Sequence, residues 1–291
     1  DLISIYRIVN DHKIEIKSSP PIVVYRENIK RMGGPFEGKS PNKHNRFFVE
    51  VESLPDNIIN AMKAGEIQVE GKIKDAKELA AKLQELGMDR EEARGVVSFA
   101  GHNVLIDATK GIQYLNEVIE LCKQGFEEAM HLGPLAQEKV SGVKVRLVDA
   151  KLHEDSIHRG PAQVIPAFRS AVYGAMATAG RVLLEPMTKI HINCPESVMG
   201  DTLREVQQRR GIIEEINQEG DVSIIVAQAP VAEMFGFASA IRGATQGRAL
   251  WSTENSGFVP VPGELQTKVV EQIRTRKGLK PEPYDASYYS G

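Results

Sequence analysis

The chain has 291 residues, of which 42% are hydrophobic and 26% charged, with a formal net charge of −3. This composition is ordinary for a globular protein with a sizeable core, and the length allows two domains and a fragment of a third. The negative balance argues against a protein that wraps a long nucleic-acid duplex, because that needs a broad cationic surface. Any contact with nucleic acid should therefore be local.

Cysteine content and hydropathy exclude two further classes. Cys122 and Cys194 are too few for a disulfide framework and are not spaced as a metal site, which favours two reduced, buried thiols. Residues 1–17 lack the basic-then-apolar order of a signal peptide. The longest charge-free helical stretch, Ser170–Gly180, is far shorter than the ~20 residues that span a bilayer. We expect a cytoplasmic protein that has no membrane partner.

The first elements are a helix end and two strands. Residues 1–17 are typical of the last turns of an amphipathic helix followed by a short alternating run. Because this helix has no beginning, we expect the chain to be the later part of a longer protein. After two prolines, Ile22–Tyr25 predicts a strand, and the alternation of Phe47, Val49 and Val51 predicts another.

Two helices then open with the same local signal. Asp75 and Glu78 have the spacing of a capping box, and the helix that they open should end at Gly87. Asp89 and Glu92 repeat this signal for the next helix.

Further elements complete a first domain. They are a short buried strand, a long helix, an alternating strand and a second core-facing helix, expected at Val104–Ile106, Ile112–Phe126, Val143–Leu147 and Val164–Met176. Pro166 either opens or kinks the last helix. Residues 18–186 are thus expected to form one α+β domain.

The pattern restarts after Pro186 as a βαββαβ unit over residues 187–263, the order of a ferredoxin-like domain. Its elements are expected at Thr188–Ile192, Leu203–Val206, Ile212–Ile216, Val222–Val226, Met234–Ile241 and Ala249–Thr253. A C-terminal helix and polar tail fill residues 264–291. The basic run Arg274, Arg276, Lys277 and Lys280 is either a solvated helix end, favoured by the helix dipole, or an RNA contact.

Gly33–Ser40 satisfies the phosphate-loop pattern G-x-x-x-x-G-K-[ST], but its setting is unsuitable. A phosphate loop needs a buried strand before it and a helix after it. Here a proline and an alternating strand follow, so a P-loop nucleotide-binding enzyme is the disfavoured alternative. Asn42–Asn45 likewise imitates a guanine-reading element, but Asn45 lacks the required carboxylate.

The segment from Lys39 to Arg46 has a second possible role. Lys39, Lys43 and Arg46 lie within eight residues with no acid among them, so they predict a cationic turn between two strands. Such a turn is either a phosphate contact or a solvated hairpin tip.

His158 lies on the loop between the alternating strand and the second core-facing helix. Convergence with His153 and Asp155 on a metal is one alternative, although the spacing matches no helical ligand pair. Catalysis is another, but no nucleophile or orienting carboxylate is near in sequence. A recognition tip is the third, because Gly160 and the following proline make a tight turn into a helix whose first amides face outward. A plain surface histidine stays open as well.

Asp155–Pro166, with the sequence DSIHRGPAQVIP, closely resembles the diphthamide loop of the elongation factor 2 family. The proline and alanine after Gly160 resemble the archaeal form of the loop. Further segments resemble the same family, so that the likeness covers nearly the whole chain: Ser18–Glu27, Ser40–Arg46, Gly111–Leu115, Arg209–Gly211 and Phe235–Phe237.

The resemblance implies a domain organisation. Residues 1–17 would be the end of domain III, and residues 18–186 a domain IV with a ribosomal-protein-S5-like fold. Residues 187–263 would be the ferredoxin-like domain V, followed by the helix and tail of residues 264–291. The family binds GTP with magnesium in a front domain that this sequence lacks. We therefore expect no cofactor, metal or catalytic residue in this segment.

The resemblance also implies a function. The family drives GTP-dependent translocation of tRNA and mRNA, and this part would place its tip in the decoding site of the ribosome. His158 would carry diphthamide, a modification that adds a fixed cation to a loop in which Glu154 and Asp155 outweigh Arg159. The RNA-contacting tip would comprise Lys39, Asn42, Lys43, His44, Arg46, Asp155, Ile157, Arg159 and Gly160.

Partners follow from the same resemblance. They are ribosomal RNA, the mRNA–tRNA duplex, the enzymes that synthesise diphthamide and, for some members, ADP-ribosylating toxins, with the chain itself a monomer. A relative that acts in ribosome assembly or splicing would share these folds. Such relatives generally lack the histidine at this place in the loop, which favours the translocase.

Overall fold

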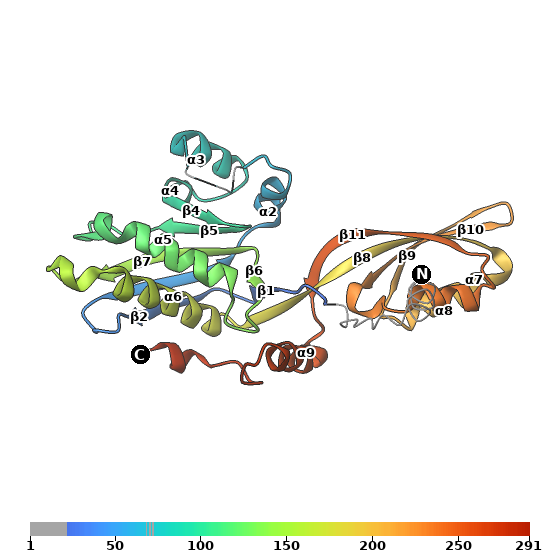
Figure 1. Ribbon diagram of the computed structural model, residues 1–291. Helices are drawn as coiled ribbons and strands as arrows, with labels where there is room; N and C mark the ends of the chain where they lie inside the picture. The colour runs from blue at the N-terminus through green and yellow to red at the C-terminus, as the bar shows by residue number, and fades with distance from the viewer. Residues whose placement is uncertain (1–21, 68, 70, 72) are drawn as a thin grey trace, which may run out of the picture.

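The computed structural model describes residues 22–67, 69, 71 and 73–291, and it consists of two lobes joined by a narrow waist (Figure 1). The helix end expected within residues 1–17 lies outside the described residues. In the part of the chain that is described, no helix is both long and apolar enough to cross a bilayer.

The first lobe is built on a five-stranded sheet covered on one face by two helices. Its strand order is β2 (Gly33–Lys39), β3 (Arg46–Ser53), β7 (Val143–Lys151), β5 (Asn103–Asp107) and β4 (Val96–Ala100). Helices α5 (Leu115–His131) and α6 (Pro161–Thr178) pack on it through a core that includes Phe47, Phe126 and Phe168. The sequence predicted β3, β5, β7 and both helices, although α5 begins three residues later than its apolar stripe; it did not predict β4 and gave no bounds for β2.

The glycines of the phosphate-loop pattern have a packing role. Gly33 and Gly38 lie within β2, where a Cβ would stand 2.3 Å from the carbonyl oxygen of Ala175 and 2.2 Å from that of Ala167. Only glycine therefore lets α6 approach this strand so closely. After β2 the chain turns into β3, and the next helix begins at Asp56. The segment is thus a strand of a hairpin, as its setting indicated.

Three short helices form a small cap beyond β4 and β5: α2 (Asp56–Lys63), α3 (Ala76–Glu85) and α4 (Arg90–Arg94). The Asp75 carboxylate accepts from the amides of Lys77 and Glu78, and Asp89 caps α4 in the same way. Both predicted helix starts are confirmed, because this signal is local in sequence.

The second lobe has the ferredoxin-like order. Its strands β8 (Arg181–Pro195), β9 (Ile212–Glu219), β10 (Val222–Pro230) and β11 (Leu250–Pro260) lie in the spatial order β11-β8-β10-β9. Helices α7 (Met199–Gln207) and α8 (Phe237–Ala244) cover one face of this sheet. The predicted βαββαβ unit is confirmed.

One strand connects the lobes. The first four residues of β8 pair with β1 (Arg26–Ile29), which in turn pairs with β6 (Lys139–Val140), whereas the later residues pair with β10. Pro186, the expected domain boundary, lies inside β8. Opposite it, β11 carries a bulge containing Gly257, whose φ of 82° favours glycine. The sheet therefore continues through the waist.

The C-terminal part of the chain returns to the first lobe. Helix α9 (Gly263–Arg276) crosses the waist, and Arg274 donates to the carbonyl of Leu135 at 2.8 Å. The tail beyond it packs on α6, where Tyr289 makes an edge contact with Tyr173. Arg274 and Lys277 of the predicted basic run thus serve the fold, Lys277 through the carbonyls of Ala136 and Gln137. Four short 3-10 helices complete the described part of the chain, namely η1 (Ser156–Arg159), η2 (Glu196–Val198), η3 (Val231–Glu233) and η4 (Ala286–Tyr289).

One expectation needs correction, one alternative left open is decided, and one expectation is confirmed. The strand predicted at Ile22–Tyr25 starts four residues later, as β1, where partners are available on both sides. Pro166 does not open α6, because Pro161 occupies the first position and Pro166 lies inside the helix. Cys122 and Cys194 are free, buried thiols, and burial raises the pKa of Cys122 well above its usual range.

Candidate functional site

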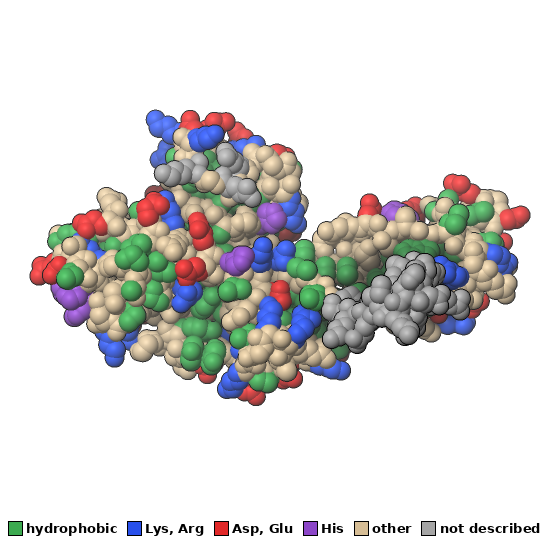
Figure 2. Space-filling model, in the orientation of Figure 1, with side chains coloured by type: hydrophobic (Ala, Val, Ile, Leu, Met, Phe, Trp, Pro, Cys, Tyr) green, Lys and Arg blue, Asp and Glu red, His purple; other side chains and the backbone are tan. Residues whose placement is uncertain are grey.

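Two loops meet at the end of the first lobe that is farthest from the waist. One is the β2–β3 turn, and the other runs from the end of β7 through η1 to α6. They meet because β3 and β7 are antiparallel neighbours, with Arg46 paired to Lys151. Figure 2 shows histidine side chains gathered at this end. We call the two loops together the tip.

Three histidine rings form a cluster on the tip. The ring centroids of His153 and His158 are 4.5 Å apart, and His44 lies 4.7 Å from His158 and 4.9 Å from His153. The Nδ1 atom of His153 accepts a hydrogen bond from the Asp155 amide at 3.1 Å, which leaves the proton of the neutral ring on Nε2. The imidazole of His158 is half-buried and reaches the surface.

A buried asparagine joins the two loops. Asn45 is fully buried; its Nδ2 donates to the carbonyl of His158 at 2.7 Å, and its Oδ1 accepts from the amide of His153 at 3.1 Å. Asn42 also donates to the His158 carbonyl, and its own amide donates to Gln163 on α6. The backbone of His158 is therefore fixed while its ring is left available.

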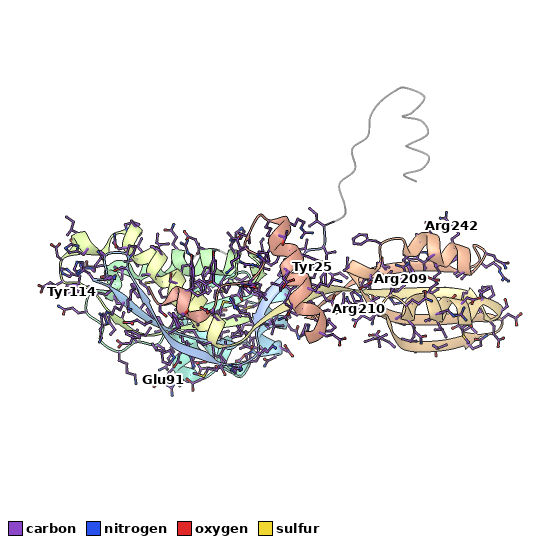
Figure 3. The ribbon with its side chains drawn as sticks, turned by 90° about the horizontal axis from the view of Figure 1, so that it is seen from below. Tyr25, Glu91, Tyr114, Arg209, Arg210 and Arg242 are labelled. Atoms are coloured by element: carbon purple, nitrogen blue, oxygen red, sulfur yellow. The ribbon has the colours of Figure 1, made fainter. Side chains whose placement is uncertain are left out.

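Arg159 faces inward. It is only 5% exposed, and its guanidinium donates to the carbonyls of His153 and Glu154 and to the carboxylate of Glu117 on α5. Its guanidinium carbon also stands 4.3 Å from the ring centre of Tyr114, a cation–π contact. This placement argues against the expected contact of Arg159 with RNA, because the contact would require the buried guanidinium to leave these partners. Figure 3 shows Tyr114 at the far end of this lobe.

The other predicted tip residues lie nearer the surface. Lys43, His44, Arg46 and Asp155 are exposed, and Ile157 is 76% exposed. Gly160 and Asn42 are intermediate, Gly160 as the N-cap of α6. The Asp155 carboxylate accepts from the Ile157 amide and so begins η1.

The cations of the β2–β3 turn differ in their pairing. Lys39, whose side chain is about one quarter exposed, lies 3.8 Å from Glu37, and Arg46 lies 3.1 Å from the same carboxylate. Among the residues that the structure describes, Lys43 has no ion-pair partner. The turn is cationic, as predicted, but the single carboxylate of Glu37 on β2 lies near two of its three cations and offsets one positive charge.

Neither alternative chemistry gains support from this geometry. Over the described part of the chain, no group of three histidine, cysteine or acidic side chains is arranged to hold a metal ion. The histidine rings contact one another through their faces and edges, and one nitrogen of His153 is already hydrogen-bonded.

Sequence reasoning missed the residues that hold the tip together. Asn45 was considered only as a failed guanine contact, and Glu117, Tyr114 and Gln163 were not assigned to the site. A turn asparagine between a lysine-rich segment and a strand was the available signal for Asn45. Glu117 on α5 and Tyr114, the N-cap of that helix, are more than forty residues from Arg159, and Gln163 on α6 is 121 residues from Asn42, so only the fold brings these pairs together.

Comparison with known proteins gives two adjoining matches. A family model described as elongation factor G, domain IV, matches residues 65–180, and one described as elongation factor G C-terminus matches residues 182–269. The two models meet at the start of β8.

Individual relatives match over nearly the whole chain. The elongation factor 2 of Thermoplasma volcanium is 60% identical over 99% of this chain and 39% of its own length. The elongation factor 2 of Picrophilus torridus is 57% identical over the same shares, and that of Pyrococcus furiosus is 57% identical over 97% and 38%. The chain thus spans about two fifths of the length of the curated relatives that it matches.

Proposed function

Because the chain belongs to the elongation factor 2 family, we propose that it is the part of a GTP-dependent translocase that enters the decoding site of the ribosome. In this proposal the tip contacts the mRNA–tRNA duplex after translocation and hinders its return. GTP and magnesium are bound by another domain of the whole protein. The protein acts in the cytoplasm as a monomer.

The observation that carries this proposal is the convergence of two loops at the free end of an elongated lobe (Figure 1). RNA duplexes are recognised mainly through shape and backbone. The tip suits such contact because it offers Lys43, Arg46 and the exposed Ile157 around a cluster of imidazoles. Asn45 holds the two loops together from within.

We assign His158 as the residue modified to diphthamide. Its carbonyl is held by Asn42 and Asn45, so a large group on the ring need not disturb the loop. Glu154 and Asp155 are exposed beside it, whereas the charge of Arg159 is directed inward to Glu117. The unmodified loop therefore presents net negative charge, and a fixed cation on His158 would favour contact with phosphate. The modifying enzymes, and ADP-ribosylating toxins that act on diphthamide, are the further proposed partners.

The proposed domains are domain IV at residues 18–186 and domain V at residues 187–263. The end of domain III is proposed at residues 1–17, and the helix and tail follow at 264–291. Continuity of β8 through Pro186 gives domains IV and V a shared strand. A push on the second lobe would then reach the first lobe through this one strand, whereas the tip loops belong to the separate sheet β2-β3-β7-β5-β4.

Mass spectrometry of the peptide containing His158, from protein made in its native cell, tests the modification. We expect the mass of diphthamide on this residue, and an unmodified peptide would overturn the assignment. A reading-frame reporter tests the function. His158→Ala should raise slippage, whereas His191→Ala, a control on the second lobe with a partly exposed ring, should not.

Fractionation of cell extracts by sedimentation distinguishes the proposed translocase from a protein of ribosome assembly or splicing. The proposed translocase should sediment with translating ribosomes in a manner that depends on its tip. Exclusive association with ribosome precursors or spliceosomal particles would contradict the proposal. Equilibrium binding of GTP or ATP to this chain would revive the nucleotide-binding alternative, which the strand geometry of Gly33–Lys39 disfavours.

A further inference from the structure

A second group of cations lies at the waist. Arg26 of β1 and Lys139 of β6 are direct partners in the parallel pairing of these strands. Directly paired residues place their side chains on the same face of a sheet, so these two side chains leave neighbouring backbone positions on one face. Lys139 is exposed and Arg26 is half-buried.

Elements packed against this edge add a third cation and a histidine. The amide of Gly142 donates to the carbonyl of His102 at 3.2 Å, and a Cβ on Gly142 would lie 3.0 Å from Ile59 of α2. Lys63 follows Ile59 by four residues and so lies on the same face of α2. Lys63 is exposed, and His102 is half-buried. We call Arg26, Lys63, His102 and Lys139 the waist cluster.

The charged groups that face His102 are both cations. Burial first, and then repulsion by Lys63 and Arg26, lowers the pKa of His102. The closest acids along these strands are engaged elsewhere. Glu27 points to the opposite face and accepts from the amides of Leu135, Ala136 and Glu138. Glu138 pairs with Lys277 at 2.8 Å.

Within the described residues, none of the three cations of the waist cluster has an ion-pair partner. Like charges that face each other across paired strands destabilise a sheet. Lys63 alone could be explained by its place in the last turn of α2, where the dipole favours a cation. The helix dipole does not explain Arg26 and Lys139, because both lie on strands. Arg26 is moreover held in place, 5.1 Å above the Phe258 ring, with one N–H donated to the carbonyl of Tyr25.

We propose that Arg26, Lys63 and Lys139 form a second phosphate-binding surface, which contacts the backbone of ribosomal RNA at the waist while the tip occupies the decoding site. The choice of ribosomal RNA as the partner depends on the proposed function. RNA is favoured over an acidic protein because clustered Arg and Lys side chains suit a repeating phosphate backbone without sequence readout. Figure 2 shows blue and purple side chains side by side in this region, between the cap and the second lobe.

Salt dependence of ribosome binding tests the surface. The triple variant R26Q/K63Q/K139Q should lower affinity at least tenfold at low salt. Each lost phosphate contact should also reduce the slope of log K against log salt by about 0.7 to 0.9. The matched control is K77Q/K110Q/K268Q, which removes three exposed lysines outside the cluster with the same change of charge. Equal slopes and affinities for the two triple variants would overturn the proposal.

Site-specific crosslinking separates this proposal from the tip function. Cys122 and Cys194 are 0% and 1% exposed, so a benzophenone maleimide can be directed to K139C or, as a tip probe, to K43C. A crosslink from position 139 to ribosomal RNA supports the surface. A crosslink from position 139 to protein only would replace RNA by an acidic protein partner and overturn the proposal.

The remaining outcomes are also decisive. A crosslink from position 43 without one from position 139 would overturn the waist surface and leave the tip function standing. No crosslink from either position, with the labelled proteins folded, would contradict both proposals.

Discussion

The tip and the waist both bury polar groups, but with different partners. At the tip, the neutral amide of Asn45 and the guanidinium of Arg159 bond mainly to backbone atoms, and the histidine rings are left near the surface. At the waist, the carboxylates of Glu27 and Glu185 are buried, and Glu185 meets the guanidinium of Arg210. The tip network thus fixes the backbone beneath rings that the proposed function assigns to an outside partner, whereas the waist network joins parts of the fold. The two should respond differently to substitution.

The largest effect should come from breaking the ion pair at the waist. Arg210 donates to both oxygens of Glu185, at 2.9 and 2.7 Å, and to Glu233 at 3.0 Å. Arg210→Met would leave the buried Glu185 carboxylate without its cation, so we expect the free energy of unfolding to fall by about 3 kcal/mol. Urea denaturation followed by fluorescence measures this change, because the single Trp251 packs on Phe237 in the same lobe. Figure 3 shows Arg210 where the second lobe meets the waist.

A neighbouring arginine gives the control for this variant. Arg204 on α7 pairs with Asp201, and both side chains are at least half exposed. Arg204→Met should change stability by less than about 0.5 kcal/mol, because exposed ion pairs contribute little. Equal losses in the two variants would show that burial of Glu185 is not what makes the pair important.

The next largest loss of stability should come from removing Asn45, which joins the two tip loops. Asn45→Ala removes the hydrogen bonds of the side chain to the His158 carbonyl and the Ser40 hydroxyl and leaves the amide of His153 without its acceptor. We expect a loss of about 2 kcal/mol. The rings of His44 and His158 should also separate, which nuclear Overhauser contacts between them would report. Asn217→Ala, an exposed asparagine of the second lobe, is the control. Persistent ring contacts in Asn45→Ala would remove Asn45 from its joining role.

The first lobe also shows how far sequence reasoning reached. Local signals were sufficient for the caps at Asp75 and Asp89, and alternation was sufficient for β3 and β7, because each depends on neighbours in sequence. The inward direction of Arg159 could not be predicted, since its partners Glu117 and Tyr114 are more than forty residues away.

The waist was less predictable than either lobe. Pro186 was expected to be a boundary because the pattern of predicted elements restarts after it. In the fold, the bulge at Gly257 lies opposite Pro186 in the neighbouring strand, and β8 continues through the proline. A compensation in a strand seventy residues later leaves no signal at Pro186 itself. Likewise, β1 was placed too early because its partner strands, and not its own residues, define its limits.

The pH dependence of stability tests the waist network separately from the tip, through the buried carboxyl group of Glu27. Burial raises the pKa of Glu27 to about 6 from an ordinary 4.5, although the amides of Ala136, Leu135 and Glu138 favour the ionised form. The native state therefore binds the proton more tightly than the unfolded state does. The contribution of Glu27 to stability is greatest below pH 4.5 and decreases as the pH rises through 6.

The difference between the two pKa values corresponds to at most about 2 kcal/mol. The free energy of unfolding of the wild-type protein minus that of Glu27→Gln should show this decrease. Denaturation of both proteins from pH 4 to pH 7.5 measures it. Comparing the two proteins cancels the titration of other acids. A difference that does not change with pH would mean that the three amide donors compensate fully for burial of the carboxylate.

The smallest effect on stability should come from His158→Ala, although it should have the largest effect on function. The loop is held by the carbonyl of His158 and not by its ring, and alanine retains that carbonyl. Only the ring contacts with His44 and His153 are lost, and the ring already reaches the surface. We expect a change of less than about 0.5 kcal/mol. His153→Ala is the informative partner, because it removes the acceptor of the Asp155 amide and should destabilise the loop more. If His158→Ala unfolded the tip instead, as judged by exchange of the His153 amide, the ring would be part of the tip network and its loss could not be attributed to RNA contact alone.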